Sequence, residues 1–265
     1  MYTDEQLSDS DDDFEALVRE GSAVPTEGWD FSWFDGRAIE DSPSWGYAAR
    51  LAPLYSSAEA VLDVQTGGAE VFAEALTAAD PRPTTVLATE SWSPNLELAR
   101  QRLADFGGRV YQIPDDADLP VTDSSVDVVS SRHPTVTRYD EIARVLRVGG
   151  TFISQQVVGL ATNREIYEFF LGPQDHDPEE GLRLIREGVA AAGMRLDDLR
   201  YEQTRVEFFD VGALVYFLRK VPWTVPDFTV ERYRDKLIEA HAEILQNGAF
   251  VSYSRHALVV ATKPE

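Results

Sequence analysis

From residue 59 onward, short apolar runs alternate with amphipathic stretches of about ten residues, and this alternation constrains the fold more than any other feature. Five apolar runs are predicted to be strands, at residues 58–64, 84–90, 109–113, 125–131 and 151–158. Three stretches among them have helical spacing, at residues 69–79, 93–107 and 138–150. Strands that alternate with helices predict a doubly wound, mostly parallel sheet with crossover helices on its faces.

The C-terminal part of the chain follows a different order. A helical pattern over 177–193 precedes a long polar-alternating strand over 199–209, two further helices between 212 and 248, and a final strand over 255–263. Two strands separated by two helices at the end of a parallel sheet suggest that the last strand runs antiparallel. We therefore predict one α/β domain over residues 56–265, with a helical insertion at about 211–250.

The N-terminal part, residues 1–55, is predicted to be an acidic tail followed by an aromatic cap. Residues 1–13 are polar and acidic, and we expect them to be frayed. Three of the five tryptophans, Trp29, Trp33 and Trp45, precede the first predicted strand. These aromatic side chains either close over a ligand as a lid or fill the open end of the sheet. The sequence leaves both interpretations open.

The formal net charge of −22 argues against a polyanionic partner such as DNA or RNA. The densest basic stretch, residues 232–236, lies within a helical pattern with acids nearby and is interpreted as a solvated helix face. No apolar run reaches the roughly 18 residues of a membrane span. We therefore expect neither nucleic-acid nor membrane binding.

The chain has no cysteine, which excludes disulfides, thiolate metal sites and a cysteine nucleophile. Its four histidines are too scattered to suggest a metal site, so no metal is predicted. The first 20 residues lack the basic and apolar regions of a secretory signal. A cytoplasmic location is the expectation that follows.

Residues suited to ligand binding gather at the carboxyl ends of the predicted strands, where doubly wound folds bind their ligands. The first strand runs into Gln65-Thr66-Gly67-Gly68-Ala69, whose small residues allow a ligand to approach the backbone closely. Glu90 ends the second strand, 23 residues after Gly67. A carboxylate there can accept hydrogen bonds from both ribose hydroxyls. The pattern predicts a nucleoside-containing ligand.

The same loop argues against a dinucleotide. A dinucleotide site needs G-x-G-x-x-G, with the pyrophosphate at a helix N-terminus. Here Gln65 replaces the first glycine, and Glu70 stands where the pyrophosphate charge would arrive. An acid at that place accepts a ligand with cationic groups, such as the sulfonium and amino groups of S-adenosyl-L-methionine. A nicotinamide dehydrogenase is therefore disfavoured.

Four stretches resemble motifs of the class I S-adenosylmethionine-dependent methyltransferases. The stretches are "VLDVQTGGAE" at 61–70, "VLATE" at 86–90, "IPDDADLPVTDSSVDVV" at 113–129 and "EIARVLRVGGTFISQQV" at 141–157. The resemblance covers roughly residues 45–160 by motif and the C-terminal part by element order. It implies a Rossmann-like sheet of seven strands whose last strand is antiparallel.

The resemblance also implies roles for individual residues. Asp63 and Gly67 fall on positions of the first motif, and Glu90 falls on the ribose acid. Asp115 falls on the acid that meets the adenine amino group, although Asp116 is adjacent and could serve instead. Asp63 is either near the methionine amino group or an acceptor that stabilises the loop.

Two residues depart from the first motif, which is written E/D-x-G-x-G-x-G. Gln65 stands at its first glycine and Ala69 at its third. Because Gln65 has a Cβ, it must take an ordinary φ or accept backbone strain. We predict that the loop still binds the cofactor through the backbone around Gly67 and Gly68.

The leading functional hypothesis is methyl transfer from S-adenosylmethionine to a small or medium-sized acceptor by direct in-line displacement. The sulfonium activates the methyl group itself, so the absence of a recognisable catalytic triad is expected. His133 follows the fourth predicted strand and is either a general base or a structural histidine. The alternative is a non-catalytic, nucleotide-binding regulatory protein on the same fold.

Overall fold

The computed structural model describes residues 4–26, 31–159, 162–175, 177 and 179–265. The α-helices are α1 (Asp4–Ala23), α2 (Tyr47–Ser56), α3 (Glu70–Ala78), α4 (Ser93–Leu103), α5 (Tyr139–Val145), α6 (Arg164–Leu171), α7 (Glu180–Ala191), α8 (Val211–Lys220) and α9 (Arg234–Asn247). The strands are β1 (Ala38–Glu40), β2 (Ala60–Asp63), β3 (Thr85–Glu90), β4 (Arg109–Gln112), β5 (Val126–Arg132), β6 (Leu146–Val157), β7 (Arg195–Phe208) and β8 (Phe250–Thr262). Short 3₁₀ helices cover Ser32–Phe34 and Ala104–Phe106.

The strands form one mixed sheet in the order β1-β7-β8-β6-β5-β2-β3-β4. The pairs from β6 to β4 are parallel, whereas β8 runs antiparallel to β6. The predicted α/β class, the mostly parallel sheet and the antiparallel last strand are therefore confirmed. The chain order reverses between β2 and β5, which is where ligands of such sheets bind.

The sheet has eight strands instead of the seven that were predicted. The additional strand is β1, which pairs antiparallel with β7, so that Ile39 lies opposite Glu207. Three residues are too few to show the alternation by which a strand is predicted from sequence. Strand β1 forms because the end of β7 offers a pairing partner, and that partner is distant in the sequence.

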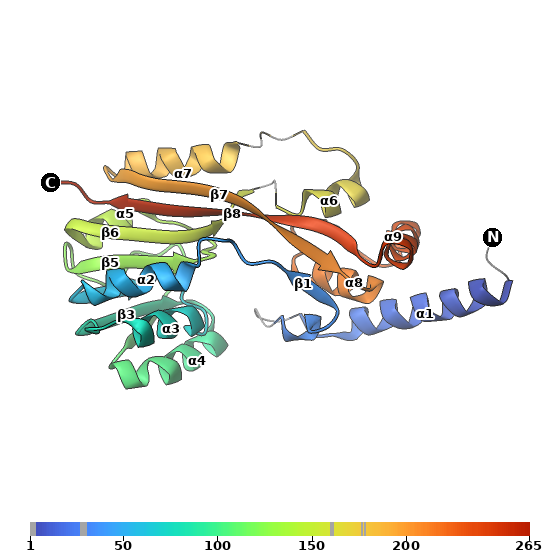
Figure 1. Cartoon of the computed structure of the whole chain (residues 1–265), viewed down its shortest axis with the longest axis horizontal. Coiled ribbons are helices and arrows are strands. Elements are labelled where there is room, and N and C mark those ends of the chain that lie inside the picture. The colour runs from blue at the N-terminus through green and yellow to red at the C-terminus, as the bar shows by residue number, and fades with distance from the viewer. Residues whose placement is uncertain (1–3, 27–30, 160–161, 176, 178) are drawn as a thin grey trace. The chain divides into compact units, whose positions relative to one another are not determined.

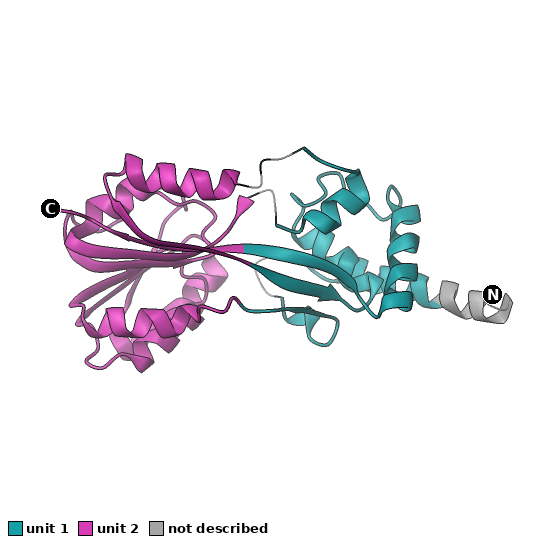
Figure 2. Ribbon diagram, turned by 45° about the horizontal axis from the view of Figure 1, so that its top comes forward, with its two compact units in different colours: residues 1–42, 160–177, 203–255 teal, residues 43–159, 178–202, 256–265 magenta. Residues whose placement is uncertain are grey.

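The chain folds as two compact units, drawn in different colours in Figure 2. Unit 1 comprises residues 1–42, 160–177 and 203–255, and unit 2 comprises residues 43–159, 178–202 and 256–265. Strands β7 and β8 contribute residues to both units. The division that the sequence predicted, at residue 55 and with an insertion at about 211–250, stays a prediction about domains.

Unit 2 has a core on each face of its part of the sheet, and alternate residues of the strands face the two cores. In β2, Leu62 packs with Ile142 of α5 and Ile185 of α7. The neighbouring Val61 packs on the opposite face with α2, α3 and α4, where Phe72 is fully buried. This layering, visible in Figure 1, holds the carboxyl ends of the central strands in fixed positions.

Unit 1 is built around helix α8, which packs against α1. Helix α1 begins at Asp4, so the prediction that residues 1–13 are frayed is wrong from residue 4 onward, and residues 1–3 lie outside the described residues. The helix is anchored by Phe14 and Val18, which are buried with Leu214 of α8.

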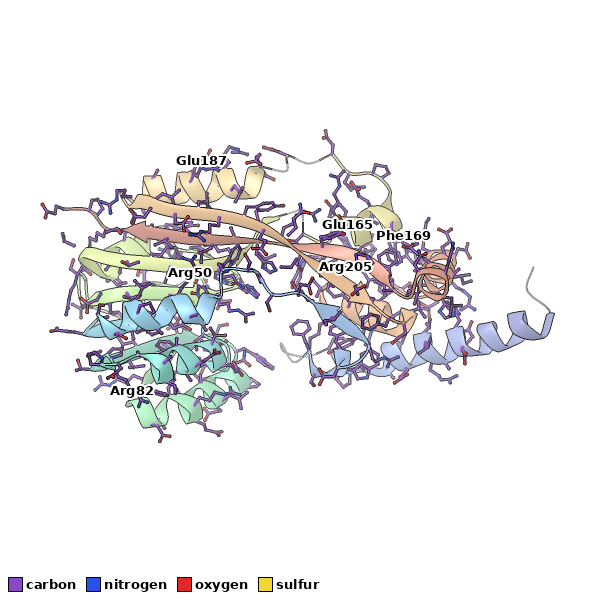
Figure 3. All side chains as sticks on the ribbon, in the orientation of Figure 1. Arg50, Arg82, Glu165, Phe169, Glu187 and Arg205 are labelled. Carbon is purple, nitrogen blue, oxygen red and sulfur yellow. The ribbon has the colours of Figure 1, made fainter. Side chains whose placement is uncertain are left out.

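Helix α6 is tied to β8 within unit 1 by a network around Glu165, which is labelled in Figure 3. Its carboxylate accepts from the buried Arg255 guanidinium at 3.0 Å, from the Ser252 hydroxyl at 3.0 Å and from the Tyr253 amide at 3.1 Å. Pairing with a buried cation fixes the start of α6.

The helix expected over residues 138–150 ends at Val145, because Leu146 already pairs with Val126 of β5. The glycines at 149 and 150 therefore lie inside β6, where the pairing register with β5 shifts. No helix in the described part of the chain is both long enough and apolar enough to cross a bilayer.

Candidate functional site

The loop after β2 keeps the backbone shape of a glycine motif although two of its glycines are replaced. Gln65, Gly67 and Ala69 have φ angles of +57°, +62° and +63°. All three lie in the left-handed region, which costs a residue with a Cβ about 1–2 kcal/mol. Gln65 has therefore accepted strain instead of an ordinary φ, and the motif's conformation survives its change of sequence.

Glu90 holds this loop against the end of β3. Its carboxylate accepts hydrogen bonds from the amides of Gly67 at 2.8 Å, Ser91 at 2.9 Å and Trp92 at 2.8 Å. Glu90 is only 6% exposed. Burial raises its pKa, and these three donors oppose that rise. The predicted ribose acid thus also fixes the position of Gly67.

Asp115 lies near Glu90, and its charge is a further cause of the raised pKa of Glu90. It accepts a hydrogen bond of 2.6 Å from the Thr135 hydroxyl. The neighbouring Asp116 is exposed, and its carbonyl accepts from Arg138 at 2.6 Å. Of the two candidate adenine acids, Asp115 is the one that the fold brings beside the glycine loop.

Asp63 is buried at the end of β2, with 6% of its surface exposed. The Ser130 hydroxyl donates to it at 2.5 Å, and the oxygen of Ser130 lies 2.7 Å from the Tyr55 hydroxyl. Burial raises the pKa of Asp63 to about 6, against the opposing effect of the Ser130 and Thr66 hydroxyls. The backbone of Thr66 also donates to the Thr89 carbonyl at 2.9 Å, which ties the loop to β3.

The two central glycines of the loop differ in their surroundings. A Cβ built on Gly67 would meet nothing within 4 Å. A Cβ on Gly68 would lie 2.5 Å from the Arg102 guanidinium and 2.4 Å from the Glu70 carboxylate. Arg102 donates to the Gly68 carbonyl and pairs with Glu70 at 2.6 Å. The open face of the loop is therefore at Gly67.

Gln65 spans from this loop to the segment after β5. Its side-chain oxygen accepts from the Thr135 amide at 2.6 Å, and its side-chain nitrogen donates to the Val136 carbonyl at 2.6 Å. The Gln65 amide donates to the Thr89 hydroxyl at 3.1 Å. The residue at the first motif glycine is thus held by both its side chain and its backbone.

His133 follows β5 directly and is held on several sides. Its φ is +54°, and its amide donates to the Gln155 carbonyl at 2.7 Å. Its Nε2 lies 2.9 Å from Nε2 of Gln155, and the ring of His256 stacks on it at 5.3 Å. The Gln155 oxygen accepts from the Trp45 indole at 2.8 Å.

This arrangement determines which nitrogen of His133 carries the proton. An indole N–H can only donate, so the Gln155 oxygen must face Trp45 and the amide nitrogen must face His133. Nε2 of His133 is therefore the acceptor, and the neutral ring carries its proton on Nδ1. A general base acting through Nε2 would require Gln155 to move. The catalytic role of His133 stays a prediction.

Comparison with known proteins supports the interpretation of this site. No curated protein matches the sequence. Residues 62–154 match the family model described as a methyltransferase domain. Together with the strand order, this confirms the resemblance to the class I methyltransferase family. The matched residues include Asp63, Gly67, Glu90 and Asp115.

Three solved structures share the fold of this chain. A protein from Deinococcus radiodurans of unknown function has 14% identity and a TM-score of 0.57, with 95% of this chain and 99% of that chain covered. The YcgJ protein from Bacillus subtilis has 16% identity, a TM-score of 0.55 and coverage of 82% and 99%. A candidate methyltransferase from Bacillus halodurans has 20% identity, a TM-score of 0.54 and the same coverage. At these identities the likeness shows the fold.

The aromatic residues expected to be a lid or a plug divide between the two units. In unit 2, Trp45 and Tyr47 are buried, and the Tyr47 hydroxyl donates to the carbonyls of Ser131 at 2.8 Å and Ile153 at 3.1 Å. They pack against β5 and β6, and the choice between a lid and a plug stays a prediction. Trp33 packs in unit 1, and Trp29 lies outside the described residues.

Sequence reasoning missed Thr135 and Gln155, which hold Asp115 and His133. For Gln155 a signal was present, because "SQQ" places three polar residues in an otherwise apolar strand that is buried on both faces. Arg50, labelled in Figure 3, was also missed, and it donates to the Trp45 carbonyl at 3.0 Å. For Thr135 the sequence carries no signal, since its partners are distant in the chain.

The raised pKa of Asp63 predicts how the stability of unit 2 depends on pH. The unfolded chain releases this proton near 3.8 and the folded chain near 6. Between these values the folded state binds more protons, so its stability falls as the pH rises, by about 3 kcal/mol in all. Asp63→Asn should remove this fall. Urea unfolding at about pH 4 and about pH 7 measures it.

The control for this prediction is Asp105→Asn, at an exposed position of the same unit. This variant should keep the wild-type dependence on pH. If Asp63→Asn loses as much stability between the two pH values as the wild type does, Asp63 is not the group responsible.

Proposed function

We propose that the protein transfers a methyl group from S-adenosylmethionine to a small or medium-sized acceptor by direct in-line displacement. The observation that carries this proposal is the placement of Glu90 beside Gly67 at the point where the strand order reverses. A buried carboxylate next to an open glycine backbone is the arrangement that a ribose requires. The match of residues 62–154 to a methyltransferase domain supports the same conclusion.

The residues present fit this cofactor. The open space beside Gly67 leaves room for a ligand to lie against the backbone. Glu90 would accept hydrogen bonds from the ribose hydroxyls, and Asp115 would accept from the adenine amino group. The buried Asp63 would keep its negative charge more readily beside a cationic amino group. The three acids thus complement a ligand with hydroxyl, amino and sulfonium groups.

When bound, S-adenosylmethionine supplies a methyl group that its own sulfonium activates. The chain then has to orient the acceptor and exclude water. Among the described residues, no group of three or more histidine, aspartate or glutamate side chains is arranged to hold a metal ion. His133 is the residue that the sequence predicted to be catalytic. It directly follows β5, and its Nε2 lies 2.9 Å from Nε2 of Gln155.

The position of Glu70 is the reason for proposing S-adenosylmethionine as the ligand instead of a dinucleotide. Glu70 is the first residue of α3, where a pyrophosphate would meet the helix N-terminus. Its carboxylate already pairs there with Arg102. A pyrophosphate would therefore compete with a carboxylate for the positive end of the helix and for Arg102.

Gly67→Val is expected to abolish cofactor binding. The branched side chain would fill the open space beside the loop and would also be strained at a φ of +62°. Gly107→Val is the matched control, because Gly107 has a φ of +64° and equally open surroundings but lies after α4, outside the loop. Calorimetric titration with S-adenosylmethionine, S-adenosylhomocysteine and NAD measures the effect.

The outcomes of this titration separate the hypotheses. We expect the wild type and Gly107→Val to bind the two sulfur ligands and not NAD, and Gly67→Val to bind none. Binding of NAD alone would overturn the choice of cofactor. Normal binding by Gly67→Val would show that the loop is not the site.

A second candidate function is a nucleotide-binding regulatory protein that kept the fold and lost turnover. The bridge that Gln65 makes from the glycine loop to Thr135 favours it, because such a contact restrains a loop that a catalytic cycle must open. Conversion of S-adenosylmethionine to S-adenosylhomocysteine in a panel of acceptors distinguishes the two. Tight binding without conversion in any acceptor would support the regulatory function.

A further inference from the structure

We propose that Gln65 and Thr135 form a polar bridge that the methyl donor must displace, so that these two residues set the affinity of the site. This inference rests on the proposed function. It assigns a role to Thr135, which no sequence motif singles out, and to the residue that replaces the first motif glycine.

The bridge joins three of the loops at the proposed site. Gln65 belongs to the loop after β2, Thr135 to the loop after β5 and Asp115 to the loop after β4. The Thr135 amide donates to the Gln65 oxygen at 2.6 Å, and the Thr135 hydroxyl lies 3.1 Å from the same oxygen. The hydroxyl also donates to Asp115 at 2.6 Å. One continuous set of hydrogen bonds therefore spans the ends of three strands.

A ligand that contacts Gly67, Glu90 and Asp115 must compete with this bridge. The bridge occupies an oxygen of Asp115, which is the acceptor proposed for the adenine amino group. Two cavities of the protein lie away from this bridge. One, of about 290 Å³, lies at the opposite ends of the strands, beside Thr84 and Arg109. The other, of about 670 Å³, lies in unit 1, beside Arg19 and Phe228.

Gln65 also carries backbone strain. Gln65 has a φ of +57°, so it is held in a conformation that disfavours a residue with a Cβ. Its side chain makes hydrogen bonds to residues 135 and 136, and these contacts offset that strain. Strain and bridge are therefore two separate features of Gln65, and replacement of this residue by alanine or by glycine distinguishes them.

The test is the affinity for S-adenosylhomocysteine of four variants, measured by calorimetry. Gln65→Ala removes the bridge and keeps the Cβ strain, whereas Gln65→Gly removes both. Thr135→Val frees Asp115. Gln101→Ala, at an exposed glutamine of α4, is the matched control. We expect binding to tighten about 5- to 50-fold in Gln65→Ala, less in Thr135→Val and not in the control.

The bridge itself is tested without ligand by hydrogen exchange. The Thr135 amide should exchange faster in Gln65→Ala than in the wild type, because it loses its acceptor. Unchanged exchange would show that the bridge does not form, and the proposal would fail.

The failure of this proposal differs from the failure of the proposed function. If the wild type binds S-adenosylhomocysteine and Gln65→Ala binds it equally or more weakly, the bridge does not oppose binding. Tightening in Gln65→Gly alone would attribute the effect to strain and overturn the role of the bridge. If the wild type and all variants bind neither S-adenosylhomocysteine nor S-adenosylmethionine, the proposed function fails and this proposal fails with it.

Discussion

Replacement of Glu90 by alanine is expected to weaken the binding of S-adenosylhomocysteine by about 100-fold, or about 3 kcal/mol. Two losses add. The ribose hydroxyls lose a charge-assisted acceptor, and the Gly67 amide loses the carboxylate that positions the loop at 2.8 Å. Calorimetric titration measures the first effect, and hydrogen exchange of residues 65–69 in the free protein measures the second.

Glu97→Ala is the matched control for Glu90. Glu97 is an exposed acid on α4 that pairs only with Arg100 in its own helix. This variant should bind as the wild type does. Unchanged affinity in a folded Glu90→Ala protein would show that the ribose assignment is wrong. Faster exchange of the loop with unchanged affinity would restrict Glu90 to a structural role.

Gly21→Val is expected to destabilise unit 1 by about 3 kcal/mol or more. Helices α1 and α8 cross so closely that a Cβ on Gly21 would lie 2.2 Å from the Gly212 carbonyl oxygen. A Cβ on Gly212 would in turn lie 2.5 Å from the Leu17 carbonyl oxygen. Because both obstacles are backbone atoms, the helices would have to separate and expose Phe14 and Val18. Thermal and urea unfolding measure the loss.

Ala23→Val is the control for this prediction, since it adds apolar atoms at an exposed position of the same helix. It should change the free energy of unfolding by less than about 0.5 kcal/mol. A Gly21→Val protein as stable as the wild type would mean that α1 does not pack against α8 through these glycines.

Much of the candidate site was predictable because it depends on local pattern and on one topological rule. The alternation of apolar runs and helical stretches located β2, β3, β4 and β5, and in a parallel sheet the carboxyl ends of these strands lie together. Glu90 and either Asp115 or Asp116 were therefore predicted to share one site. The structure places Glu90 beside Gly67, and Asp115 lies near Glu90.

Other parts could not be predicted, because they depend on partners distant in the sequence. Strand β1 forms only where β7 offers an edge, and α5 ends at Val145 because Leu146 finds a partner in β5. The choice between Asp115 and Asp116 stays a prediction, and the structure adds that Asp115 lies near Glu90.

The sequence by itself determined the fold class, the antiparallel last strand and the location of the glycine loop, since hydrophobic periodicity and glycine placement are local properties. Only the tertiary structure decided what Gln65 does there. Its left-handed φ is tolerated because two residues some 70 positions away in the chain bind its side chain. The Thr135 amide donates to the side-chain oxygen, and the Val136 carbonyl accepts from the side-chain nitrogen. Likewise, the position of the proton on His133 follows from Trp45 through Gln155. A proton or a strained torsion is set by the donors and acceptors that surround it, and folding alone brings those together.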